Sequence, residues 1–122
     1  MKTHNIIINT KTKKYPIVIG SNIIRNISKI LFSKKINFEK CLIVSDNHIP
    51  IKLKSNLINN INVKSKIIYN FTASEKNKNY KNVEKIHNIL FKNNFNRKDC
   101  VISFGGGITG DVTGFAASIF KR

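Results

Sequence analysis

Glycines gathered between residues 105 and 110 are the part of this sequence whose type and spacing point most directly to chemistry. Gly105, Gly107 and Gly110 fit the spacing G-x-G-x-x-G, with which many proteins join a strand to a helix around a dinucleotide. Because glycine has no Cβ, the backbone can approach a pyrophosphate closely, and the following helix offers free N–H groups and the positive end of its dipole. The spacing therefore predicts a pyrophosphate-binding loop; the alternative is a tight strand-to-helix turn that holds no ligand.

Side chains around these glycines complete the candidate loop. We expect the backbone of residues 106–109 to face the pyrophosphate and the Thr109 hydroxyl to be able to donate a further hydrogen bond. Asp111 is expected in the first turn of the helix, where a carboxylate suits the dipole; because it would repel phosphate, it is expected to fix the loop or to contact the nicotinamide side. The candidate cofactor-binding residues of the loop are Gly105, Gly106, Gly107, Ile108, Thr109, Gly110 and Asp111.

A second candidate, Asp46, follows an apolar run that ends at Val44 and Ser45. Ligands of open α/β sheets bind at the carboxyl ends of strands, and an acid placed there can accept hydrogen bonds from ribose or adenine groups. The alternative is that Asp46 caps the helix expected to begin after residues 47–50. Both interpretations stay open at this point.

No other residue pattern predicts catalysis or metal binding. His4, His48 and His87 are scattered and no two of them have the spacing of metal ligands on a helix. The sequence contains no H-E-x-x-H motif, no P-loop lysine pattern and no Ser-His-Asp set, and its 6 acidic residues offer no close pair for acid–base work. We therefore predict no catalytic residue and no metal ligand in this chain.

The chain is strongly basic, with 22 Lys and Arg against 6 Asp and Glu and a net charge of +16 over 122 residues. Such a charge ordinarily suggests a nucleic-acid or anionic partner. However, all but Arg25, Arg97 and Arg122 are lysines, which are spread along the chain and accompany abundant Asn and Ile, as AT-rich coding produces. This argues against nucleic acid as the main partner, although the charge should still attract phosphates.

Two cysteines and the apolar runs set the expected compartment. Cys41 and Cys100 lie in separate strand-like runs without a C-x-x-C pair, which is typical of free thiols in a reducing compartment. The N-terminus has no apolar stretch long enough for a signal peptide, and no run approaches the ~20 residues of a membrane span. We expect a cytoplasmic protein without a membrane partner.

Strand-like and helix-like segments alternate along the chain. The expected strands are Ile6–Asn9, Tyr15–Ile19, Cys41–Ser45, Lys66–Tyr69 and Cys100–Phe104, the first two forming a hairpin. We expect a first helix with Ser21 as its N-cap and a second helix that Pro50 opens. A third is expected over Asn79–Asn93, and a fourth after the glycine loop. A hairpin followed by strands that alternate with helices predicts βαβ units and a parallel sheet.

Apolar spacing also predicts the buried side of each helix. The residues expected to face inward are Leu53, Leu57, Ile58 and Ile61 in one helix, Val83, Ile86, Ile89 and Leu90 in the next, and the stripe Ile108, Val112, Phe115 and Ile119 in the last.

Three segments resemble one known family. Residues 105–117 read Gly-Gly-Gly-x-x-Gly-Asp-x-x-Gly-Phe-x-Ala, which resembles the signature of 3-dehydroquinate synthases, members of the sugar-phosphate cyclases. Residues 15–20 resemble the first hairpin strand of that family. Residues 74–78 resemble its Gly-Glu-x-x-Lys nucleotide-contact motif, with Ser74 in place of the glycine. The resemblance extends over essentially the whole chain.

The resemblance implies an α/β fold: a Rossmann-like parallel sheet with an N-terminal β-hairpin, truncated before the helical metal-binding domain. Residues 1–122 would be the N-terminal part of the NAD-binding domain, and the C-terminal metal and substrate domain would be absent. The family motif nominates Glu75 to hold ribose hydroxyls and Lys78 to neutralise phosphate, and it supports a nucleotide role for Asp46. NAD is the implied cofactor; a divalent metal, zinc or cobalt, is expected only in the complete protein.

The complete enzyme implied by the resemblance is a lyase that converts 3-deoxy-arabino-heptulosonate 7-phosphate to 3-dehydroquinate and phosphate, in the shikimate route to aromatic compounds. The resemblance also implies a homodimer. Residues 1–122 alone are expected to be inactive. Two alternatives stay open. The chain could belong to another sugar-phosphate cyclase of the aminocyclitol or valiolone type, or it could be a small basic module that binds phosphate or nucleic acid with its glycine loop.

Overall fold

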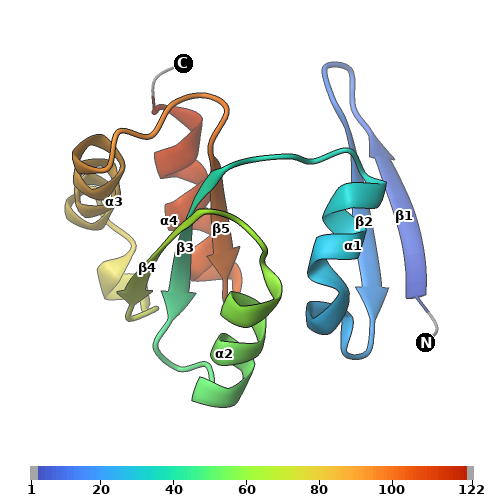
Figure 1. The fold of residues 1–122 in the computed structure, drawn as a ribbon. Coiled ribbons are helices and arrows are strands. Elements are labelled where there is room, and N and C mark those ends of the chain that lie inside the picture. The colour runs from blue at the N-terminus through green and yellow to red at the C-terminus, as the bar shows by residue number, and fades with distance from the viewer. Residues whose placement is uncertain (1–2, 121–122) are drawn as a thin grey trace.

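The structure is a computed structural model that describes residues 3–120. A β-hairpin at the N-terminus is followed by strands and helices in alternation (Figure 1). The strands are β1 (Thr3–Asn9), β2 (Lys14–Gly20), β3 (Lys40–Asp46), β4 (Ser65–Phe71) and β5 (Cys100–Phe104). The α-helices are α1 (Ile27–Ser33), α2 (Ile51–Asn60), α3 (Tyr80–Lys92) and α4 (Gly107–Ser118), and short 3₁₀ turns are η1 (Ile23–Asn26) and η2 (Glu75–Asn77).

A parallel sheet in the order β4-β3-β5 forms the centre of the fold. β3 pairs in parallel with both neighbours, and residues 41–46 are buried, as a continuous apolar run in a central parallel strand requires. After β3 the chain moves outward to β4 and then returns across β3 to β5. Such a reversal of strand order leaves a crevice at the carboxyl ends of the strands, which is where open α/β sheets bind ligands.

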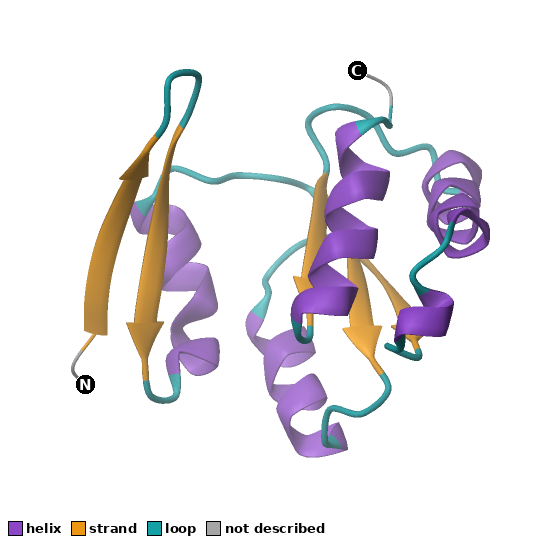
Figure 2. Cartoon of the chain, turned by 180° about the vertical axis from the view of Figure 1, so that it is seen from behind, coloured by secondary structure: helices purple, strands orange, loops and turns teal. Residues whose placement is uncertain are grey.

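Helices cover both faces of this sheet and give it two cores (Figure 2). Alternate residues of β3 point to opposite faces: Leu42 and Val44 belong to the core under α3 and α4, whereas Cys41 and Ile43 belong to the core under α2. The buried members of the first core are Leu42, Val44, Phe71, Val83, Ile86, Leu90, Phe95, Val112 and Ala116; those of the second are Cys41, Ile43, Leu57 and Ile61. The molecule is therefore a three-layer α/β/α arrangement.

The hairpin forms a separate two-stranded antiparallel sheet, with α1 beside it (Figure 1). Its turn is closed by Thr10, whose backbone N–H donates to the Lys13 carbonyl at 2.8 Å and whose Oγ1 accepts from the Lys13 N–H at 2.9 Å. The Ser28 hydroxyl of α1 donates to the carbonyl of Asn60 at the end of α2. This bond helps to attach the hairpin side of the chain to the central sheet.

The predicted α/β class, hairpin and parallel sheet are confirmed, but the helix boundaries and faces differ in detail. Ser21 is not an N-cap: the chain turns through Asn22 in the left-handed region (φ 56°), and η1 begins at Ile23 without a side-chain cap. Leu53 is 43% exposed rather than inward. Of the stripe predicted for the last helix, Ile108 and Val112 of α4 do pack in the core, but Phe115 and the C-cap residue Ile119 are 45% and 53% exposed.

Candidate functional site

Asp46 and Gly105 meet at the carboxyl edge of the sheet. Asp46 ends β3, Gly105 directly follows the neighbouring strand β5, and a Cβ built on Gly105 would lie 3.0 Å from the Cβ of Asp46. It would also lie 2.7 Å from Oγ1 of Thr109, a separation that real Cβ atoms essentially never show. Gly105 is therefore required because two neighbours approach its backbone closely, and none of the glycines among residues 3–120 has a positive φ.

The glycines that follow leave the N-terminus of α4 open. A Cβ at Gly106, Gly107 or Gly110 would have no atom of the described residues within 4 Å, apart from the adjacent residues and the backbone of its own helix. Gly106 is the N-cap of α4 and makes no side-chain cap bond, so the first N–H groups of the helix carry no cap from this residue. An open backbone together with these N–H groups and the helix dipole suits an anion such as a pyrophosphate.

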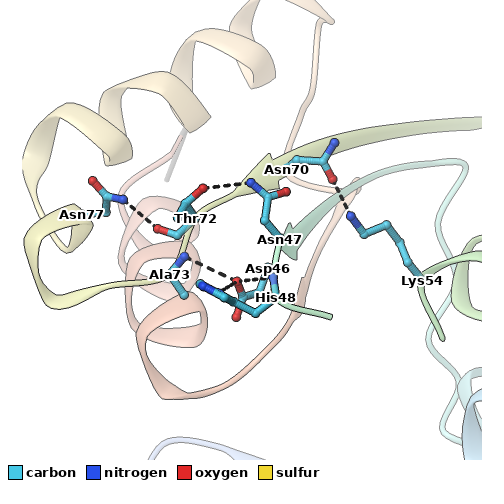
Figure 3. A network of polar contacts seen from close by, with 8 residues as sticks. All are labelled: Asp46, Asn47, His48, Lys54, Asn70, Thr72, Ala73 and Asn77. Carbon is cyan, nitrogen blue, oxygen red and sulfur yellow. Dashed lines mark hydrogen bonds and ion pairs between the residues drawn. The ribbon is translucent and has the colours of Figure 1, made fainter. Parts of the chain in front are cut away.

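Asp46 is held by three hydrogen bonds to one carboxylate oxygen (Figure 3). Its Oδ1 accepts from the His48 backbone N–H at 3.1 Å and from the Ala73 N–H at 3.4 Å, and it lies 2.8 Å from His48 Nδ1. Burial would raise the pKa of this carboxyl, but the bonds from His48 and Ala73 outweigh burial and hold the pKa below its ordinary value. Asp46 is therefore an anionic acceptor at the edge of the sheet.

The structure answers whether Asp46 caps the helix that follows it. The N-cap of α2 is Pro50, so Asp46 does not cap that helix; instead it closes the turn from β3 through the His48 N–H. Asn47 donates its Nδ2 to Oγ1 of Thr72 at 2.8 Å, which fastens the same turn to the segment after β4 (Figure 3). The sequence analysis did not single out His48 and Ala73 as partners of Asp46. The short spacing between Asp46 and His48 could have predicted that contact. The sequence holds no such signal for Ala73, because Ala73 donates through its backbone N–H.

Lys78 and Asp111 form an ion pair at the entrance of the loop, with Lys78 Nζ 2.9 Å from Asp111 Oδ2. The pKa of Lys78 is raised, first by its hydrogen bond to Asp111 and then by the charges of Asp111 and Glu75. The expectation that Asp111 lies in the first turn of its helix is wrong: α4 starts at Gly107, and its first turn contains no acidic residue. Asp111 instead fixes the loop from the next turn by pairing with Lys78.

Ser74 fits the place where the family motif has glycine. Its backbone is extended (φ −160°, ψ 158°), which any residue can adopt, and its Oγ accepts from the Asn77 N–H at 3.2 Å. The replacement therefore adds a cap to η2, the turn that carries Glu75 and leads to Lys78.

Thr109 and Ile108 do not point toward an open ligand site. Thr109 is fully buried, and Ile108 is half-buried against the core under α3 and α4. In this arrangement their backbone N–H groups, rather than their side chains, are the groups able to meet a phosphate. The outward side of α4 near the ion pair borders a groove of about 580 Å³ whose walls include Tyr80 and Phe115, packed edge to face with ring centroids 6.1 Å apart.

The structure brings the two cysteines together, although they are far apart in sequence. Cys41 and Cys100 are register partners on β3 and β5, and both are free thiols. Burial raises the pKa of Cys41, which nearby Lys66 partly offsets, and burial with the neighbouring Cys41 raises the pKa of Cys100 to about 11. Both thiols are therefore protonated at neutral pH and are poor nucleophiles. Among residues 3–120 no group of three His, Cys, Asp or Glu side chains could hold a metal ion.

The sequence is similar to those of known proteins. Residues 68–122 match the family model described as 3-dehydroquinate synthase N-terminal. The 3-dehydroquinate synthase of Pelagibacter ubique is 50% identical over 115 residues, which are 94% of this chain and 31% of that protein. The corresponding enzyme of Prochlorococcus marinus subsp. pastoris is 35% identical, over 100% of this chain and 34% of its own length. The chain thus spans about a third of the length of these relatives.

Solved structures give the fold. A crystal structure of 2-deoxy-scyllo-inosose synthase superposes with a TM-score of 0.83 and 19% identity, over 95% of this chain and 33% of that chain. A second one, complexed with carbaglucose-6-phosphate, NAD+ and Co2+, has a TM-score of 0.79 and 18% identity, over 96% of this chain and 32% of that chain. No helix within residues 3–120 is both long and apolar enough to cross a membrane.

The fold, an α/β arrangement with a parallel sheet at its centre, is that of 2-deoxy-scyllo-inosose synthase. The family match and the curated relatives confirm the resemblance to the 3-dehydroquinate synthase family.

Proposed function

We propose that residues 1–122 are the N-terminal part of the NAD-binding domain of a 3-dehydroquinate synthase. The observation that carries this proposal is the open N-terminus of α4 at Gly106 and Gly107. The residue before it, Gly105, lies directly beside the anionic Asp46. The relatives support the particular enzyme, because a 3-dehydroquinate synthase is 50% identical whereas the 2-deoxy-scyllo-inosose synthase, an aminocyclitol-type cyclase, is 19% identical.

The described residues fit NAD. The N–H groups at the start of α4 and the open backbone of Gly106 and Gly107 would receive the pyrophosphate. Asp46, at the carboxyl end of β3, would accept hydrogen bonds from adenosine groups. Glu75 and Lys78 follow the end of β4 and would contact ribose and phosphate, with Asp111 holding Lys78 in place.

In the complete enzyme we propose conversion of 3-deoxy-arabino-heptulosonate 7-phosphate to 3-dehydroquinate and phosphate. NAD, when bound, supplies transient oxidation of a secondary alcohol, which acidifies the neighbouring hydrogen so that phosphate can leave, and it is regenerated within the cycle. The present residues bind and orient the cofactor. The divalent metal and the sugar-acid phosphate would be held by residues outside this segment, because residues 3–120 offer no metal cluster. We further propose a cytoplasmic homodimer.

The first test is a titration of the ¹⁵N-labelled chain with NAD. We expect amide shift changes confined to residues 106–110, 46–48 and 73–78. Lys78→Ala should weaken NAD binding by about tenfold because it removes a phosphate partner. Lys76→Ala is the matched control, since Lys76 lies in the same turn and makes no ion pair with an acidic side chain of the described chain; it should bind as the wild type does.

A titration without changes at these residues up to millimolar NAD would refute the cofactor assignment. Binding of polynucleotide that is steeply salt-dependent and independent of NAD would favour a basic nucleic-acid module, which the charge of +16 suggests. The chain alone should release no phosphate from 3-deoxy-arabino-heptulosonate 7-phosphate; turnover would contradict the proposed absence of catalytic residues.

A further inference from the structure

We propose that Thr109 is a positioning residue of the nucleotide site, which sets the glycine loop against Asp46 through the shape of its buried side chain rather than through its hydroxyl. This inference rests on the proposed NAD site, but it concerns a residue whose side chain the binding of NAD would not be expected to touch.

Three residues meet at one point. A Cβ added to Gly105 would lie 2.7 Å from Oγ1 of Thr109, 3.0 Å from Cβ of Thr109 and 3.0 Å from Cβ of Asp46. The Thr109 side chain and the base of the Asp46 side chain thus both lie against the side of Gly105 on which a Cβ would stand. Removing atoms from the Thr109 side chain would leave Gly105 room to move relative to Asp46.

The Thr109 hydroxyl is not what the position requires. Thr109 has 0% exposure, and its Oγ1 has no hydrogen-bond partner among the described residues. A buried hydroxyl without a partner destabilises the folded state, so an isosteric apolar side chain should be tolerated. What remains useful is the space that Cβ and Oγ1 of Thr109 fill against Gly105.

Asp46 transmits a displacement to two neighbouring segments. Its Oδ1 accepts from the His48 N–H and the Ala73 N–H, so a shift of Asp46 lengthens bonds on both the β3 and the β4 side of the crevice. The Thr109 side chain would therefore couple the phosphate end of the site to its adenosine end, although this side chain contacts neither ligand group itself.

Thr113 provides a matched control. It lies one turn later on the same helix, is also buried (2% exposed) and also has an unpaired Oγ1, but the atoms nearest to the added Cβ at Gly105 belong to Thr109 and Asp46 and not to Thr113. Thr109→Ala and Thr113→Ala remove the same atoms from similar surroundings, and both should lower the melting temperature.

The experiment measures amide hydrogen exchange and NAD affinity of the 122-residue chain with four variants. Thr109→Ala should speed exchange of the His48 and Ala73 amides beyond the general change seen in Thr113→Ala, and it should weaken NAD binding by about tenfold. Thr109→Val should leave exchange of the His48 and Ala73 amides at the wild-type rate and melt at the same or a higher temperature. Thr109→Ser, which keeps Oγ1 against Gly105 and loses only the methyl group, should stay closer to the wild type than Thr109→Ala does.

Two outcomes would overturn the role proposed for Thr109. Loss of NAD binding in Thr109→Val with normal exchange would show that the hydroxyl contacts the ligand. Equal effects of Thr109→Ala and Thr113→Ala on His48 and Ala73 would show ordinary packing. If the wild-type chain itself fails to bind NAD, the proposed function fails, whereas exchange at His48 and Ala73 still decides whether Thr109 positions the loop.

Discussion

At the scale of single residues, Asp46 combines a structural and a proposed binding role. Its Oδ1 takes two backbone N–H donors, from His48 and Ala73, that join the ends of β3 and β4. Its side chain still keeps 13% exposure at the edge where the proposed ligand would lie. Oδ1 of Asp46 can therefore hold the ends of β3 and β4 together while the carboxylate remains available to accept hydrogen bonds from a ligand.

The lowered pKa of Asp46 makes a prediction about pH. Because the folded pKa lies below the unfolded value of about 3.9, the carboxylate stabilises the fold fully above pH ~4, and this contribution is lost as the pH falls through the folded pKa. Asp46→Asn should lower the free energy of unfolding at pH 7 by roughly 1–2 kcal/mol. The difference from the wild type should shrink between pH 4 and pH 2 in urea titrations.

The control for this prediction is Asp99→Asn. Asp99 also accepts a backbone N–H, that of Asn96 at 2.8 Å, but at an exposed turn. Asp99→Asn should therefore lower the free energy of unfolding by no more than about 0.5 kcal/mol at pH 7. A stability difference for Asp46→Asn that stays constant down to pH 2 would contradict the role assigned to the Asp46 charge.

At the scale of elements, the turn after β4 depends on local caps. Asn79 is the N-cap of α3 and accepts from the Asn82 N–H at 2.9 Å, in the same way that Ser74 caps η2. These caps fix where α3 begins, and they also hold Lys78, which lies between the two capped elements, opposite Asp111.

Asn79→Ala should therefore cost about 1 kcal/mol of stability, the usual effect of removing a side-chain N-cap. Asn59→Ala is the control, because Asn59 is exposed inside α2 and caps neither end; it should leave stability unchanged or slightly higher, since alanine favours helix. Chemical denaturation of the two variants measures both values. Equal stability of the two variants would show that α3 does not depend on its cap.

At the scale of the whole molecule, burial is uneven. Residues 41–44 of β3 have 0% exposure, whereas the hairpin buries no residue of its described strands fully, and Ile6, Ile17 and Ile19 are 46%, 39% and 53% exposed. The hairpin therefore has little apolar burial to hold it, and the isolated chain is expected to be only marginally stable.

We predict that the hairpin opens independently of the central sheet. In native-state hydrogen exchange, amides of β1 and β2 should exchange through a low-energy opening, while those of Leu42, Ile43 and Val44 should exchange only on global unfolding. Protection of β2 equal to that of β3, or a single cooperative melt at high temperature, would contradict this picture.

The sequence by itself determined the order of the elements, the parallel sheet and the glycine loop, because apolar periodicity and glycine spacing are local properties of the chain. It also placed Asp46, Gly105 and Lys78 at strand ends, since each directly follows a strand-like run or the turn after it. These expectations needed no knowledge of which residues touch.

The tertiary structure alone decided which side chains meet. It paired Lys78 with Asp111 and Cys41 with Cys100, buried Thr109, and left Phe115 and Ile119 exposed. The apolar stripe predicted the core positions of Ile108 and Val112 correctly but not those of Phe115 and Ile119, because the face a helix buries depends on how it docks against α3 and the sheet. Contacts between segments distant in sequence arise from packing, and no local pattern of residues encodes them.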